Sequence, residues 1–359
     1  MTLYIRPVSF VESPQRHDGR TERLAGTMLW FAQVEWIQDG TRRLIDTAAV
    51  PAAIDALTAD EKNRAAAIWR NLTRPRAALT LGERVLRLDQ PHIMGILNIT
   101  PDSFSDGGRF VDDAEAAAAA GVDMARDGVS LVDVGGESTR PGAPVVWEGD
   151  EIARIQPVIE RLARSGTPVS IDSRKAAVME AALAAGAHMI NDISALLHDP
   201  NALEVARAHD VPICIMHAPS QGADPHEGGA YGDAALEVYD WLEARVETLI
   251  KAGIERSRLI IDPGLGFGKS VAENAAILNN LTLYHGLGCP ILVGASRKRM
   301  IGALSNEAPA DKRLGGSLYL AVKAIEAGAQ IVRVHDVPET VQAARIWRGL
   351  RDAALTARA

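Results

Sequence analysis

Cysteine is scarce in this sequence. Only Cys214 and Cys289 occur among 359 residues, each inside or beside an apolar run and neither within a CxxC pair. A disulfide framework or a thiolate zinc site needs several cysteines at short spacing, so the sequence excludes both as organising features. This cysteine usage is typical of a reducing compartment, and we expect a cytoplasmic protein.

The sequence also lacks long hydrophobic runs and an excess of positive charge. No apolar run approaches the roughly 18 to 20 residues that a membrane span needs, and no signal-type segment follows the first residues, MTLYIRPVSF. The net charge is -8 and arginine is dispersed, whereas a nucleic-acid surface needs a basic stripe. We therefore expect a soluble protein with a small-molecule partner, and neither nucleic acid nor membrane as a partner.

Short β-branched apolar runs alternate with longer Ala-rich segments of helical period from about residue 92 onward. The expected strands are residues 92–98, 131–136, 168–173, 189–194, 212–217, 259–264, 291–296 and 331–336. Eight such βα units predict an α/β fold of the (β/α)8 TIM-barrel type. The alternative is a doubly wound open sheet, which normally has fewer strands and often carries a GxGxxG turn after the first strand, where this chain has NITPDSFSDGG.

The first part of the chain does not share this repeat. Residues 27–45 predict a hairpin and residues 52–72 a single helix, so residues 1–75 are expected to form a small α+β appendage of unknown role. Its expected core contains three tryptophans: Trp30, Trp36 and Trp69. Residues 77–90 predict a second hairpin that closes the bottom of the barrel, which spans residues 76–359.

Polar side chains stand at or near the end of every expected strand. They are Asn98, Asp133, Asp172, Asn191, Asp192, His217, Asp262, Ser296, Arg333 and His335. One such Asp often caps the next helix, but all strand ends of a barrel face one mouth, where burying so many polar groups without partners is costly. Carboxylates and amides suit a polar heterocycle, while Arg333, His335, Lys298 and Arg140 suit an anion. The sequence predicts a ligand that joins a polar ring to a phosphate-like group.

Two other motifs do not support the functions they suggest. GLGFGKS ends like a phosphate-binding loop, but Pro263 occupies the place of the required first glycine. His217, Asp224 and His226 have no zinc-site spacing, so a protein-caged transition metal is not expected. A Mg²⁺ ion held by one protein oxygen and substrate phosphates needs no such cluster and remains possible.

A set of motifs then closely resembles the dihydropteroate synthase family of the folate pathway. The motifs are MGILNITPDSFSDGG, DVGGESTRPGA, SIDSRK, INDIS, IMH, DPGLGFGK, GASRKRMIG and IVRVHDV, in this order. The resemblance covers about residues 77–350. It implies an enzyme that joins 6-hydroxymethyl-7,8-dihydropterin pyrophosphate to 4-aminobenzoate, giving 7,8-dihydropteroate and pyrophosphate.

The resemblance implies a pterin site. Asp262 would accept the N–H and amino donors of the pterin, Asn191 and Asp172 would contact the rest of its edge, and Lys298 would hold its carbonyl side. The apolar walls would be Ile193, Met216 and Phe267.

The resemblance also implies the groups that act on the leaving pyrophosphate. Arg333 and His335 would grip it together with Mg²⁺, the implied cofactor, bound through Asn98. Asp133 and Asp172 would screen a cationic intermediate in a dissociative substitution. The residues expected to be catalytic are thus Asp133, Asp172, Lys298, Arg333 and His335.

The aminobenzoate would lie between two loops, residues 100–108 and 137–144. Phe104 and Pro141 would flank its ring, with Thr139, Arg140 and Ser296 nearby. Sulfonamides resemble aminobenzoate, so the resemblance predicts competitive inhibition by them. It also implies a homodimer through the later helices.

Two features depart from the family pattern, and two rival functions stay open. Residues 218–231, APSQGADPHEGGAY, form a longer and more polar loop than expected, and residues 1–75 are extra. A methylfolate-dependent methyltransferase shares the pterin-binding barrel but needs no pyrophosphate site. A paralogue that binds pterin without turnover would retain the same motifs.

Overall fold

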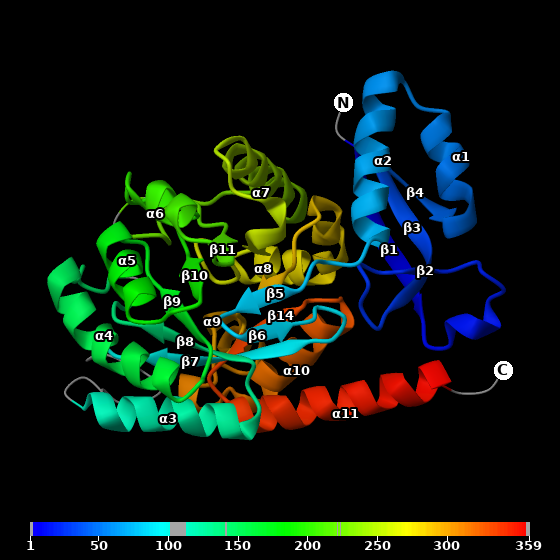
Figure 1. Ribbon diagram of the computed structural model, residues 1–359. Helices are drawn as coiled ribbons and strands as arrows, with labels where there is room; N and C mark the ends of the chain where they lie inside the picture. The colour runs from blue at the N-terminus through cyan, green and yellow to red at the C-terminus, as the bar shows by residue number, and fades with distance from the viewer. Residues whose placement is uncertain (1–2, 101–112, 141, 221, 223, 357–359) are drawn as a thin grey trace.

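Eight parallel strands form one sheet that curls into a barrel (Figure 1). The computed structural model describes residues 3–100, 113–140, 142–220, 222 and 224–356. The barrel strands are β7 (His92–Asn98), β8 (Leu131–Gly135), β9 (Val169–Asp172), β10 (Met189–Asp192), β11 (Ile213–Met216), β12 (Leu259–Asp262), β13 (Leu292–Val293) and β14 (Ile331–Val334). Their order is β12-β11-β10-β9-β8-β7-β14-β13, and a parallel bridge between Ile261 and Ile291 joins the two ends. The predicted TIM barrel is therefore confirmed.

The strand register sets the polar strand ends level with one another. Asn98 pairs with Gly135, Gly135 with Asp172, and Asp172 with Asn191, each in parallel register. The predicted bounds of β7 are confirmed, but the other strands end one to three residues earlier than expected. The residues after them turn away into loops, as at Arg297, whose φ of 57° is incompatible with a strand.

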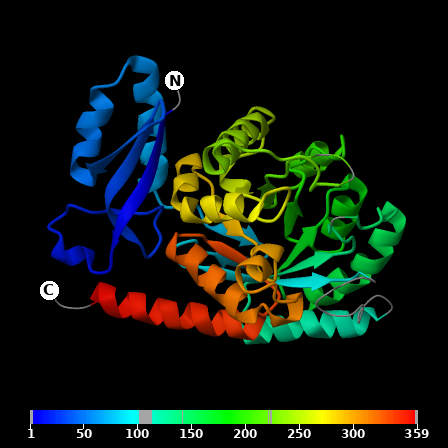
Figure 2. The same cartoon turned by 180° about the vertical axis from the view of Figure 1, so that it is seen from behind.

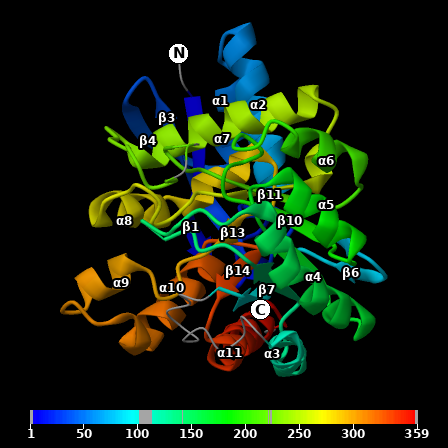
Figure 3. The same cartoon turned by 90° about the vertical axis from the view of Figure 1, so that its left-hand side faces the viewer.

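Helices follow the strands and surround the barrel, as Figure 3 shows for α4, α5, α7 and α8. Their bounds are α3 (Ala114–Asp127), α4 (Glu148–Arg164), α5 (Ala176–Ala184), α6 (Ala202–Ala208), α7 (Ala234–Lys251), α8 (Val271–Asn279), α9 (Arg299–Leu304), α10 (Leu314–Glu326) and α11 (Val337–Thr356). Capping residues set where some of these helices begin. Asp113 caps the N-terminus of α3 by accepting a hydrogen bond from the Ala116 N–H at 2.8 Å. Ser270 and Glu273 form a capping box at the N-terminus of α8.

The predicted hairpin that closes the barrel bottom is confirmed. Strands β5 (Leu79–Leu81) and β6 (Arg84–Leu86) pair antiparallel. Their leucines form one apolar cluster with side chains of the barrel strands; the cluster contains Leu79, Leu81, Leu86, Leu88, Met94, Leu131, Met189, Cys214, Ile260, Leu292 and Ile331. The bottom is thus sealed by packing, and the polar ends lie at the opposite side.

The N-terminal unit is a small sheet covered by two helices. Its strands are β1 (Leu3–Val11), β2 (Glu22–Arg23), β3 (Trp30–Gln38) and β4 (Thr41–Asp46), and its helices are α1 (Val50–Asp55) and α2 (Ala59–Thr73). The β3–β4 hairpin was predicted and is confirmed, whereas β1 and β2 were not expected. The prediction of a single helix over 52–72 is wrong, because Thr58 and Glu61 form a capping box that starts a new helix.

The three tryptophans of this unit have different environments. Trp36 is fully buried, and Trp69 packs edge-on against the ring of Phe31, with 6.0 Å between the ring centroids. Trp30 is only half-buried beneath the guanidinium of Arg23, 5.1 Å from its ring centroid. The core prediction thus holds for Trp36, partly for Trp69, and is wrong for Trp30.

The N-terminal unit lies beside the barrel in both opposite views (Figures 1 and 2) and contacts helix α7 through side chains. Tyr4 donates a hydrogen bond to Asp240 at 2.8 Å, and Arg64 pairs with Glu243 at 2.8 Å. Apolar residues of the unit and of the barrel belong to one continuous core. None of the helices in the described part of the chain combines the length and the apolar character that crossing a membrane requires.

Candidate active site

Arg333 crosses the mouth of the barrel from β14 to two carboxylates. Its Nε lies 2.5 Å from Asp133 Oδ2 on β8, and its Nη2 lies 2.6 Å from Asp172 Oδ2 on β9. Asn191 donates to the same Asp133 oxygen at 3.0 Å. Burial, together with the negative charge of Asp133, raises the pKa of Asp172 to about 7 against the opposing effect of Arg333. Although burial opposes it, the two carboxylates raise the pKa of Arg333, which stays charged.

A second ionic group lies at the end of β12 and in the loop that leads from β13 to α9. Asp262 accepts a hydrogen bond from the Gly264 N–H at 2.7 Å, and burial raises the pKa of its carboxyl. Lys298 donates to the carbonyl oxygen of Leu265, and its Nζ lies 4.6 Å from the ring centroid of Phe267. Burial lowers the pKa of Lys298 to about 8, although the charge of Asp262 acts in the opposite direction.

The side chains expected to form apolar walls come together in space. Ile193, Met216 and Phe267 form a small cluster with Ala218, separate from the main core. They come from the ends of β10 and β11 and from the loop after β12, so the barrel brings them to one mouth. An apolar surface beside buried carboxylates is suited to a flat polar ring.

Ser296 and His335 contact each other. His335 Nδ1 lies 3.0 Å from Ser296 Oγ, and Ser296 also accepts the His335 backbone N–H at 3.2 Å. Burial, followed by the charges of Arg333 and Arg297, lowers the pKa of His335 to about 3. The imidazole is therefore neutral, so it offers an anion a hydrogen bond and no positive charge.

Two polar strand-end residues serve the structure and do not face the mouth cluster. Asp192 accepts hydrogen bonds from the N–H groups of Ser194 and Leu196, at 2.7 and 2.8 Å. The ring of His217 packs edge-on against Trp241 at 5.0 Å, and burial lowers its pKa to about 3. Asp192 is thus a hydrogen-bonded turn residue, whereas His217 is a buried packing residue whose Nδ1 has no hydrogen-bond partner within the described part of the chain.

Lys269, the last charged residue of the loop that resembles a phosphate-binding motif, holds backbone. Its Nζ donates to the carbonyl oxygens of Gly264 at 2.8 Å and Phe267 at 3.1 Å. These bonds brace the loop after β12, in agreement with the rejection of a nucleotide-phosphate role.

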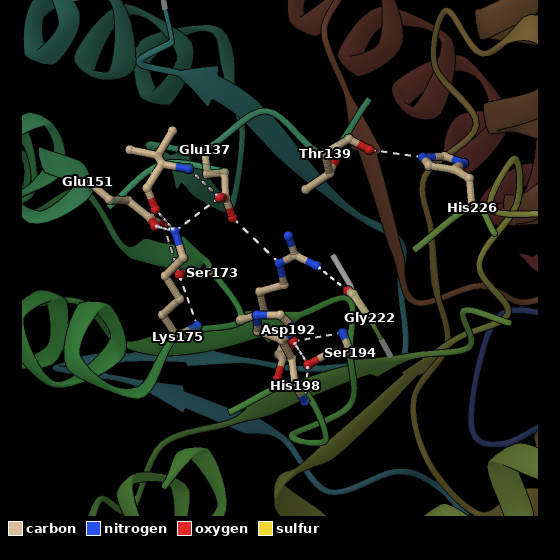
Figure 4. Close-up of polar contacts among 12 residues, drawn as sticks. Glu137, Thr139, Glu151, Ser173, Lys175, Asp192, Ser194, His198, Gly222 and His226 are labelled. Atoms are coloured by element: carbon tan, nitrogen blue, oxygen red, sulfur yellow. Dashed lines mark hydrogen bonds and ion pairs between the residues drawn. The ribbon is translucent and has the colours of Figure 1, made fainter. Parts of the chain in front are cut away.

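A buried ionic network lies behind the mouth and was not expected from the sequence (Figure 4). Lys175 Nζ lies 2.7 Å from Glu151 Oε2 and 3.0 Å from Glu137 Oε1, and Ser173 Oγ donates to Glu151 Oε1 at 2.8 Å. The network ties helix α4 to the loops after β8 and β9. It thereby fixes the loop segment that starts at Glu137.

One signal for this network was present in the sequence. Glu151 shares the buried face of α4 with Ile155, Val158, Ile159 and Leu162, so a carboxylate occupies an otherwise apolar stripe. A charged residue in that position requires a buried partner. Its partner Lys175 is not identifiable from spacing.

The residues expected near aminobenzoate are only partly described. The carbonyl oxygen of Thr139 lies 2.9 Å from His226 Nε2 (Figure 4), and Arg140 is close enough to His335 for its charge to lower the pKa of that imidazole. Phe104 and Pro141 lie outside the described residues. Asn98 is half-buried at the end of β7.

Comparison with known proteins places the chain in a family. Residues 94–335 match the family described as pterin binding enzyme. The chain is 43% identical over 274 residues to dihydropteroate synthase of Neisseria meningitidis serogroup B, covering 75% of this chain and 96% of that protein. It is 44% identical over 262 residues to dihydropteroate synthase of Escherichia coli, and this match covers 73% of this chain and 92% of that protein. The structure of Xanthomonas albilineans dihydropteroate synthase in complex with 7,8-dihydropteroate aligns with a TM-score of 0.68 at 42% identity, covering 76% of this chain and 98% of that one.

A TIM barrel with buried carboxylates and an apolar wall at its mouth defines a ligand-binding barrel of the pterin-binding class. The chain belongs to the dihydropteroate synthase family within that class, which confirms the resemblance inferred from the motifs. It is thus an enzyme, a transferase of folate biosynthesis. The matched residues 94–335 begin after the N-terminal unit.

The buried network makes a prediction about stability. Glu151→Ala leaves Lys175 and Ser173 without one buried acceptor, and we expect it to lower the free energy of unfolding by about 3 to 5 kcal/mol. Urea denaturation followed by circular dichroism measures this loss. Glu160→Ala is the matched control, because Glu160 lies on the same helix in an exposed pair with Arg164 and should cost less than about 1 kcal/mol. Equal losses in both variants would contradict a structural role of the network.

Proposed function

We propose that this chain joins 6-hydroxymethyl-7,8-dihydropterin pyrophosphate to 4-aminobenzoate and releases 7,8-dihydropteroate and pyrophosphate. The observation that carries the proposal is the convergence of Asp133, Asp172, Asp262, Arg333 and Lys298 beside a separate apolar cluster at the barrel mouth. The complex of a relative with 7,8-dihydropteroate is consistent with this reaction. The relatives named above are synthases, which favours this reaction over a methyl transfer.

The pterin ring would lie against Ile193, Met216 and Phe267. Asp262 keeps one carboxylate oxygen beyond its bond to Gly264, and this oxygen would accept from the amino and N–H groups of the pterin. Charge-assisted bonds of this kind are the stronger class of hydrogen bonds. Asn191 and Asp172 would contact the remaining edge, and Lys298 would donate to the ring carbonyl.

The reaction would be a dissociative substitution. The C–O bond to pyrophosphate breaks first, and the exocyclic methylene left behind is a cation that the electron-rich pterin delocalises. Asp133 and Asp172 would screen this positive charge, while Arg333 and the neutral His335 would donate hydrogen bonds to the departing phosphates. The neutral arylamine attacks the methylene through its nitrogen lone pair. The C–N bond forms, and the acidic ammonium that results loses one proton to solvent, so the attack needs no strong general base.

The residues at the mouth fit a Mg²⁺ ion held mainly by substrate. Within the described ranges no group of three or more His, Cys, Asp or Glu side chains is placed to hold a metal. Asn98 offers a hard amide oxygen above Gly135, where a Cβ would lie 3.5 Å from that oxygen. Mg²⁺ bound there would neutralise charge on the leaving pyrophosphate.

The aminobenzoate would bind beside Thr139, Arg140 and Ser296, with Phe104 and Pro141 still expected at its ring. The carboxylate of this substrate needs donors, and the exposed guanidinium of Arg140 supplies them. Sulfonamides would compete for the same place.

We also propose a homodimer in the cytoplasm. Several large apolar side chains are exposed on the last helices: Leu304 on α9, Leu314 and Tyr319 on α10, and Ile346 and Leu350 on α11. Exposed apolar side chains gathered on neighbouring elements mark association surfaces.

Asp262→Ala tests the pterin site. Loss of a charge-assisted acceptor should weaken pterin binding by on the order of 1.5 to 3 kcal/mol, which is roughly 10- to 150-fold. Fluorescence titration with a pterin measures binding, and pyrophosphate release measures turnover. Asp210→Ala is the control, because Asp210 is an almost fully exposed carboxylate beside Arg258 and should leave both unchanged.

The same assay contains arms that separate the rival functions. Product formation should require both 4-aminobenzoate and Mg²⁺. Pterin binding without any product would favour a paralogue that binds pterin but does not turn it over. Full activity in the presence of a chelator would refute the Mg²⁺ proposal and leave the pterin site untouched.

The lowered pKa of Lys298 predicts that turnover depends on pH. Its folded-state pKa is lowered to about 8, so the ammonium is present below that pH and is lost above it. We expect kcat/KM for the pterin substrate to fall up to tenfold per pH unit above about pH 8, with a shift of the fall to higher pH in Lys298→Arg. A profile that is flat from about pH 7.5 to 9 would show that this charge is not needed.

Light scattering tests the dimer. The purified protein at micromolar concentration should have twice the mass of one chain, and Tyr319→Glu should reduce it by placing a charge in an apolar interface. Val85→Glu is the control, because Val85 is an exposed apolar residue of the hairpin β5–β6, outside the proposed interface. A monomer mass for the unmodified protein would contradict the proposal.

A further inference from the structure

The unusual segment between β11 and α7 places one histidine between the two substrate subsites. The ring of His226 stacks on Phe267 with 4.7 Å between centroids and 13° between planes. Its Nε2 lies 2.9 Å from the carbonyl oxygen of Thr139, and its Nδ1 lies 3.2 Å from that of Gly266. Figure 4 shows the ring directed toward Thr139. His226 thus contacts the loops after β8 and β12 at once.

These contacts exclude a metal-ligand role for His226. Both ring nitrogens lie at hydrogen-bond distance from backbone carbonyl oxygens, so these oxygens occupy the positions in which a metal ion would bind the ring. Complete hydrogen bonding requires hydrogen on both nitrogens, and a ring with one N–H makes one of the two bonds. His226 therefore acts as a hydrogen-bond donor between the loops after β8 and β12, and we call these two contacts the clamp.

The backbone around His226 is itself held in place. Gly229 has a φ of 91°, and a Cβ there would lie 2.1 Å from the carbonyl oxygen of Gly268, so the two loops touch through main chain. Arg174 Nη1 donates to the carbonyl oxygen of Gly222 at 2.9 Å. The described part of the segment is thus anchored on both sides of His226, which gives the ring a defined position.

We propose that His226 is a positioning residue for both substrates. Its stacking fixes the plane of Phe267 against the pterin, and its bond to Thr139 fixes the loop that contacts aminobenzoate. The clamp keeps the two subsites at a constant separation, which the attack of the arylamine on the pterin methylene requires. This inference rests on the substrate contacts proposed above for Phe267 and Thr139.

Two substitutions separate the two contacts. His226→Phe keeps an aromatic ring on Phe267 but removes both donors, so KM for aminobenzoate should rise roughly 3- to 10-fold while KM for the pterin stays within about twofold. His226→Ala removes the ring as well and should raise both KM values. His226→Gln restores one donor toward Thr139 and should recover much of the aminobenzoate KM. Steady-state kinetics with each substrate varied in turn measures these values.

Control variants make the result decisive. His209→Ala removes a histidine paired with Glu180 on the outer surface and should change neither KM. Unchanged KM values in both the Phe and Ala variants would overturn the inference, as would a fall in kcat and unfolding temperature with unaltered KM values. Asp262→Ala is run in parallel. If Asp262→Ala weakens pterin binding while the His226 variants behave like the unmodified protein, only this inference fails. If Asp262→Ala also has no effect, the proposed pterin site fails.

Discussion

The bridge from Arg333 to Asp133 and Asp172 is the constraint on which the barrel mouth depends. It joins strands β14, β8 and β9 through three charges, of which Asp133 is fully buried. Charges in such a place are tolerated only when paired, because desolvation costs several kcal/mol per ion. Loss of the guanidinium would leave two buried carboxylates facing each other. The bridge therefore holds the two carboxylates near each other at one level of the barrel.

The same short motif after β9 serves two sides of the sheet. Asp172 points to the bridge in the mouth, whereas Ser173 and Lys175 join Glu151 and Glu137 behind it. The catalytic side of a barrel and its supporting side are thus built by neighbouring residues. Because the network holds Glu137, it sets where the loop toward Thr139 begins, and His226 then holds the loop at Thr139 itself.

The sequence allowed the barrel and the polar strand ends to be predicted because both depend on local periodicity. The bounds of β7 follow from an apolar run that stops at Asn98. Contacts between distant segments had no such signal: Lys175 is 24 residues from Glu151, and His226 is 87 residues from Thr139. The break between α1 and α2 did have a local signal, the Thr58–Glu61 capping box, which outweighs the helical period around it. Asp192 and His217 were grouped with the site because periodicity places a residue at a strand end but does not determine its partners.

The charges at the mouth explain why a cation from outside the chain suits this site. The ionisable side chains that we assign to substrates inside the barrel are three carboxyl groups and two basic groups: Asp133, Asp172, Asp262, Arg333 and Lys298. His335 adds no charge, because burial keeps it neutral. Arg333 is paired with both Asp133 and Asp172, so the negative charge of these carboxylates largely cancels the attraction of its guanidinium for a pyrophosphate. In the reaction that we propose, a site with this balance would bind the pterin through its carboxylates, and Mg²⁺ and donors on the loops, such as Arg140, would neutralise the phosphates.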